Sequence, residues 1–86
     1  MKTKCIITIT NAENAVLKSF ELVYNHSPKA ALNYALNSVQ KRLKTLIPRL
    51  FLNDAVSNRQ YRQRIAQCNT YGQEIILIID IKPLAD

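Results

Sequence analysis

The sequence predicts an α+β fold in the order ββααβ, with a three-stranded, mainly antiparallel sheet and two helices packed on one face. Three observations predict it: two alternating apolar runs near the N-terminus, a helical apolar stripe in the middle, and a third apolar run near the C-terminus. With 86 residues, the chain is expected to form a single compact domain over 1–86. That length is near the lower end of what folds without disulfides or metals.

The N-terminal strands are expected over residues 4–10 and 16–24. In both runs apolar side chains alternate with polar ones, and β-branched residues are frequent in the first. Turn-forming residues at 11–14 separate the two runs, so the pair is predicted to be a hairpin.

A first helix is expected to begin at Ser27 and Pro28, because serine can cap a helix and proline suits its first turn. Apolar residues then recur at steps of four, three, four and three, which places them in one stripe. They are Leu32, Leu36, Val39, Leu43 and Leu46. Pro48 disfavours helical geometry in the preceding residue, so the helix is expected to end near Ile47.

A second helix is expected from residue 55 to about residue 68, capped by Asn53 or Asp54. Its apolar side is narrow and consists of Tyr61, Ile65 and Cys68 at i, i+4 and i+7. The apolar connector at 49–52 is expected to close one end of the core.

The last strand, expected over residues 74–82, is apolar on both faces. Ile76 and Ile78 on its second face, together with Ile6, therefore need a cover if the helices lie on the other face. A homodimer that pairs these apolar faces, or that shares edge strands, would provide one.

Basic residues are concentrated in one segment of the chain. Between residues 41 and 64 one acid, Asp54, stands against seven cations: Lys41, Arg42, Lys44, Arg49, Arg59, Arg62 and Arg64. The resulting +6 equals the formal net charge of the whole protein. Such a local excess favours a polyanion as partner.

The sequence therefore predicts a non-catalytic binding protein that contacts DNA or RNA through two basic helices. Lys41 and Lys44 share the outer face of the first predicted helix, and Arg59, Arg62 and Arg64 belong to the second, where they could reach one phosphate backbone. Gln60 and Gln63 are side chains of the kind that reach base edges, while Tyr61 or Tyr34 could stack on an unpaired base.

The alternative is a small inhibitor of the kind encoded by phages or mobile elements, which binds an acidic host protein or a nucleoprotein complex. The first interpretation requires the two basic helix faces to converge. If they diverge, the same cations only keep the protein in solution, and a partner is to be sought on the apolar face of the sheet.

Catalysis is not expected. Asp80 and Lys82 end the last strand on one face, as in some metal-dependent nucleases, but no second carboxylate follows in that spacing. Neither a thiol paired with His26, nor a metal site, nor a cofactor site is indicated. The one glycine excludes the GxxG loop of KH domains, and the aromatic motifs of RNA-recognition motifs are missing.

The remaining sequence features concern the compartment. Cys5 and Cys68 are too few and too far apart for a disulfide framework, so both are expected to be reduced. No stretch reaches the ~20 apolar residues that span a bilayer, and no signal-peptide cleavage site follows the N-terminus. A soluble, cytoplasmic protein is therefore expected.

Overall fold

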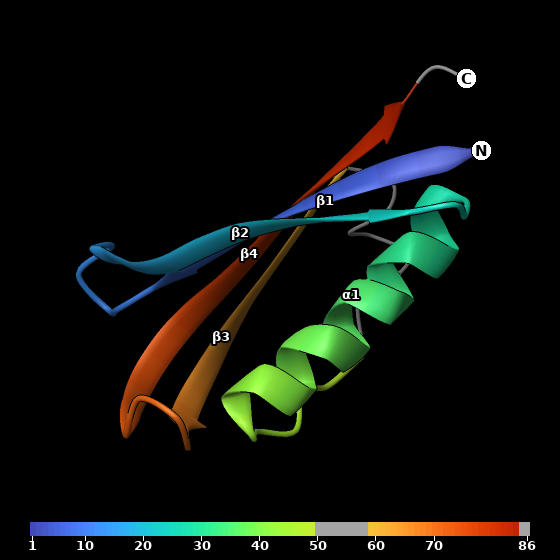
Figure 1. Cartoon of the computed structure of the whole chain (residues 1–86). Coiled ribbons are helices and arrows are strands. Elements are labelled where there is room, and N and C mark those ends of the chain that lie inside the picture. Colours follow the sequence, from blue (N-terminus) through green and yellow to red (C-terminus); the bar gives the residue numbers. More distant parts are fainter. Residues whose placement is uncertain (50–58, 85–86) are drawn as a thin grey trace.

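The structure, a computed structural model, describes residues 1–49 and 59–84. It contains the strands β1 (Lys2–Thr10), β2 (Val16–Tyr24), β3 (Gln60–Cys68) and β4 (Gln73–Leu84) and the helix α1 (Pro28–Leu43). The strands form one antiparallel sheet in the order β2-β1-β4-β3, and α1 lies along one side of it (Figure 1). The fold is therefore α+β, but the predicted three-stranded sheet with two helices is wrong.

The error lies in residues 60–68, which form β3 and not a second helix. In a strand, Tyr61 and Ile65 share a face because they are an even number of residues apart. A register shift between Ile65 and Cys68 then lets Cys68 join them in the core. The spacing of these three residues is thus compatible both with a helical stripe and with a bulged strand. Pairing with β4 stabilises the strand. Residues 50–58, which include the expected cap and the apolar connector beyond Arg49, lie outside the described residues.

The predicted N-terminal hairpin is present. β1 and β2 pair along their length, and the Asn11 side chain stabilises the turn between them. Its Oδ1 accepts hydrogen bonds from the backbone N–H groups of Glu13 (3.0 Å) and Ala15 (2.9 Å).

The helix begins at the predicted residue but ends earlier. Ser27 makes no side-chain capping bond, although its carbonyl oxygen accepts from the N–H of Ala31 at 2.8 Å. Lys44 adopts a left-handed conformation (φ 51°) after Leu43 and stops the helix. Leu46 consequently leaves the predicted apolar stripe and is 79% exposed, while Ile47 is buried in the core.

The β3–β4 turn holds the C-terminal end of α1 in place. Asn69 donates from its Nδ2 to the carbonyl oxygen of Lys44 (2.6 Å) and from its N–H to the Thr45 hydroxyl (2.8 Å). Thr70 donates to the carbonyl oxygen of Arg42 at 3.3 Å. Carbonyl groups that the end of a helix leaves unpaired are thereby satisfied.

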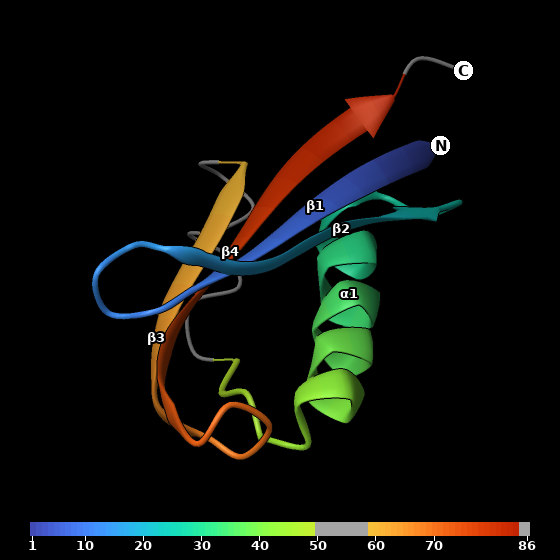
Figure 2. The same ribbon diagram turned by 60° about the vertical axis from the view of Figure 1, so that its left-hand side comes forward.

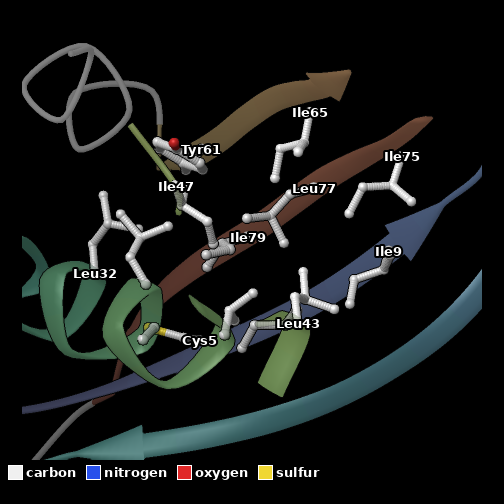
Figure 3. Packing of buried hydrophobic residues seen from close by; sticks show 14 of the residues in the cluster. Cys5, Ile9, Leu32, Leu43, Ile47, Tyr61, Ile65, Ile75, Leu77 and Ile79 are labelled. Carbon is white, nitrogen blue, oxygen red and sulfur yellow. The ribbon is translucent and has the colours of Figure 1, made fainter. Parts of the chain in front are cut away.

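The core fills the space between α1 and the sheet (Figure 3). Its sheet side comes from alternate residues of β1, β3 and β4, and its helix side from Ala31, Leu32, Ala35, Leu36, Val39 and Leu43. Four members of the predicted stripe, Leu32, Leu36, Val39 and Leu43, are buried as expected, together with Ala31 and Ala35.

No helix of the described residues lies over the opposite face of the sheet, as the view in Figure 2 shows, and this face is called the open face below. Directly paired residues share a face, so Ile6, Ile76 and Ile78 lie on it and are partly exposed. Sequence reasoning placed these three residues on the second face of the sheet, as found. That a second copy of the chain covers them stays a prediction. In the described part of the chain, no helix is long and apolar enough to cross a membrane.

Candidate functional site

The predicted basic surface is divided between two opposite sides of the molecule. Lys41 and Lys44 are exposed on α1 and at its end. Arg62 and Arg64 belong to β3, where they pair with Ile78 and Ile76 and so lie on the open face. Arg59 is exposed just before β3. The described residues do not form the predicted surface of two basic helices, because residues 60–68 of the second predicted helix are the strand β3.

A row of polar and basic residues runs along the outer side of α1. Lys29, Asn33, Asn37 and Lys41 recur every four residues, and all four are exposed. Residues four apart are neighbours on a helix surface, and the twelve residues from Lys29 to Lys41 span about 18 Å at a rise of about 1.5 Å per residue.

Arg49 folds back onto the middle of this row. Its Nη1 donates to Asn33 Oδ1 and its Nη2 to Asn37 Oδ1, both at 2.8 Å. Both acceptors are neutral amides, so the guanidinium is held in place, and no acid of the described residues pairs with it. The four cations Lys29, Arg49, Lys41 and Lys44 are called the basic row below.

Carboxylates are missing from this side of the described structure. Between Glu21 and Asp54 the sequence contains five cations and no acid. Of the described acids, Glu21, Asp80 and Glu74 belong to strand positions on the open face, and Glu13 lies in the β1–β2 turn. The basic row therefore produces a positive potential that no neighbouring acid on α1 offsets.

The open face, by contrast, mixes both signs. Lys4 forms an ion pair with Glu21 (Nζ to Oε2, 3.7 Å), and Arg64 pairs through Nε with Glu74. These exposed pairs add little to stability, but they reduce the positive field there.

Arg42 has a packing role that its place in the charge cluster did not suggest. Its guanidinium carbon lies 4.2 Å from the centre of the Phe20 ring, and the Lys18 Nζ lies 6.0 Å from the same ring. Arg42 thus covers the edge of the core where α1 meets β2.

The predicted base-reading residues are engaged within the protein. Gln60 donates from Nε2 to Asp80 Oδ1 at 2.8 Å, and Gln63 Oε1 accepts from the Tyr61 hydroxyl. Tyr61 is only 2% exposed, and its hydroxyl also reaches the carbonyl oxygen of Pro48 at 3.0 Å. Burial raises the pKa of Tyr61, and the nearby charge of Arg49 opposes that rise.

Tyr34, the other predicted stacking residue, is 47% exposed on α1. Its ring stacks on His26 (4.7 Å between ring centres) and on Tyr24 (5.8 Å). It anchors the start of α1 to the end of β2.

Sequence reasoning missed Lys29 and Arg49 as members of one surface. The four-residue spacing of Lys29, Asn33, Asn37 and Lys41 is visible in the sequence and could have revealed the row. The return of Arg49 onto Asn33 and Asn37 could not, because it depends on the path of the chain after α1.

Asp80 and Lys82, which were considered for catalysis, lie on the open face of the sheet. Asp80 Oδ1 accepts the hydrogen bond from Gln60. In residues 1–49 and 59–84 no three His, Cys, Asp or Glu side chains gather where they could hold a metal ion. Both thiols are free and buried, and burial raises the pKa of Cys5 to about 11, which disfavours a reactive thiolate.

Comparisons of the chain with protein-family models, with curated proteins and with solved structures gave no match.

Proposed function

We propose that the protein is a non-catalytic binding protein that contacts nucleic acid through the basic row on the outer side of α1. The observation that carries this proposal is Arg49, whose guanidinium is fixed by Asn33 and Asn37 between Lys29 and Lys41. A cation that is already ordered loses less conformational entropy when it meets a phosphate than a free side chain does.

The dimensions of the row suit a phosphate backbone. A duplex carries one phosphate of each strand about every 3.4 Å along its helix axis, so the roughly 18 Å between Lys29 and Lys41 corresponds to an axial length of about five phosphates per strand. The row presents charges and amides on a regular helix, which favours contact with the backbone of DNA or RNA over readout of sequence.

The proposal predicts how strongly the affinity for a duplex depends on salt concentration. Four neutralised phosphates predict that log affinity for a duplex falls with log salt with a slope of about −3.6. Between 50 and 200 mM salt the affinity would then decrease by about 150-fold.

The test compares two double variants that each remove two positive charges. Lys29→Gln with Lys41→Gln alters the basic row, and Arg62→Gln with Lys82→Gln alters the open face. Fluorescence anisotropy with a 20-base-pair DNA and an RNA duplex is expected to show a slope reduced by about two units in the first variant and by less than half a unit in the second.

Equal effects of the two variants would contradict the assignment to α1. If no DNA or RNA, single- or double-stranded, binds at low salt, the nucleic-acid proposal is wrong. The row would then suit an acidic protein or nucleoprotein partner, as expected of a phage-type or mobile-element inhibitor.

A further inference from the structure

A hollow of about 420 Å³ opens on the open face, on the other side of the sheet from the basic row. It lies where the β1–β2 turn approaches β4 and β3. The described residues that line it are Ala12, Arg62, Gln63, Arg64, Glu74 and Ile76. Its size is within the range of sites that hold small ligands or single side chains.

The residues that line the hollow come from paired strands and from a hydrogen-bonded turn. Ile76 and Arg64 are paired residues of neighbouring strands, and Arg62 follows on the same face of β3. Ala12 belongs to the turn that the Asn11 side chain holds through its two backbone hydrogen bonds. The apolar side chains of Ile76 and Ala12 and the guanidinium groups of Arg62 and Arg64 are therefore attached to strands and a turn of regular backbone geometry.

The charges around the hollow leave one positive charge uncompensated. Arg64 is paired with Glu74, whereas the Arg62 side chain is exposed and has no polar partner in the described residues. The hollow as a whole, with two guanidinium groups and one carboxylate, carries a net charge of +1.

A buried hydroxyl beside the hollow also lacks a partner. Thr10 is paired with Ile76 and therefore points to the same face of the sheet. It is 5% exposed, and its Oγ1 forms no hydrogen bond within the described structure.

We propose that this hollow binds a carboxylate carried on a short aliphatic body. Arg62 supplies the planar pair of N–H donors that fits a carboxylate, and Ile76 and Ala12 supply the surface for the aliphatic part. A monoanion balances the net charge of +1. A dianionic phosphate would instead leave excess negative charge next to Glu74.

The test is a titration of the ¹⁵N-labelled protein with sodium hexanoate, followed by amide and arginine side-chain NMR signals. Saturable shifts are expected at Ala12, Arg62, Arg64 and Ile76, with a Kd on the order of millimolar for so small a ligand. Arg62→Gln is expected to weaken binding at least about tenfold. Lys82→Gln, which removes one charge from the same face outside the hollow, is expected to change Kd by less than about twofold.

Three results would overturn the proposal: no saturable shifts with hexanoate, equal shifts with the neutral hexanol, or tighter binding of inorganic phosphate. A hexanoate affinity that survives in Arg62→Gln would contradict it as well. Because the hollow and the basic row are on opposite sides of the sheet, this experiment succeeds or fails independently of nucleic-acid binding.

Discussion

Replacing Tyr61 tests whether residues 60–68 contribute a fully buried aromatic side chain to the core. The ring lies in the buried cluster near Ile47 and Ile79 (Figure 3). Removing it in Tyr61→Ala is expected to lower the free energy of unfolding by about 3–5 kcal/mol, the usual loss for a large buried aromatic side chain. Tyr61→Phe keeps the ring and loses the hydrogen bonds of the hydroxyl to the Pro48 carbonyl oxygen and to Gln63 Oε1, which costs about 1–2 kcal/mol.

The free energy of unfolding of both variants is measured by urea unfolding followed by circular dichroism. Tyr34→Ala, which removes an exposed tyrosine ring, is the matched control. Tyr34 is 47% exposed and contributes mainly its ring stacking, so its loss is expected to cost about 1 kcal/mol. Duplex affinity of Tyr61→Phe should stay within about twofold of the unmodified protein, since the buried ring offers no surface to a ligand. A Tyr61→Ala protein less than about 1 kcal/mol destabilised would refute the placement of β3 in the core.

Substitutions at three further positions test separate parts of the fold. Gly72 has a φ of +64°, and a Cβ added there would meet no atom within 4 Å. Gly72→Ala is therefore expected to lower the free energy of unfolding, measured with urea, by about 1 kcal/mol through backbone strain alone, and Gly72→Asn by less. Equal stability of the unmodified protein and both variants would contradict this. Asn69→Ala removes the side-chain hydrogen bond to the end of α1 and is expected to lower the free energy of unfolding by about 1–2 kcal/mol. Amide hydrogen exchange at residues 41–45 is expected to become faster. Unchanged exchange at these residues would contradict the role of the β3–β4 turn in holding the helix end. Because the pKa of Cys5 is raised from 9.0 to about 11, the unfolded chain loses that proton first as pH rises. Stability is therefore expected to be complete below pH 9 and to fall by about 2–3 kcal/mol between pH 9 and 11, and less steeply in Cys5→Ala; identical pH profiles would contradict the burial effect.

The sequence predicts the helix and the two N-terminal strands because their patterns have one dominant period, and it predicts the last strand from a continuous apolar run. The helix stripe from Leu32 to Leu43 and the alternation of β1 are long and regular, and the structure contains both elements. The segment 60–68 has no such single period. Its apolar residues at 61, 65 and 68 satisfy a helix and, with a bulge, a strand, and the choice depends on pairing with β4, a long-range contact that local spacing does not encode.

Because residues 60–68 were expected to be helical, the predicted binding surface combined residues that lie on opposite sides of the molecule. The nucleic-acid hypothesis required Arg62 and Arg64, on a second helix, to converge with Lys41 and Lys44 on one surface. As strand residues they face the other way, because β3 points them to the side opposite α1. Lys41 and Lys44 keep their predicted exposure, and Gln60, Gln63 and Tyr61 are used in internal hydrogen bonds that only the fold reveals.

The most direct test of the central claim is to map a bound duplex on the protein by NMR. Titration of the ¹⁵N-labelled protein with a 20-base-pair duplex at low salt is expected to shift signals of Lys29, Asn33, Asn37, Lys41 and Arg49, while Arg62 and Lys82 on the open face stay unchanged. Shifts concentrated on Arg62, Arg64 and Lys82, with α1 unaffected, would contradict the assignment of binding to the basic row.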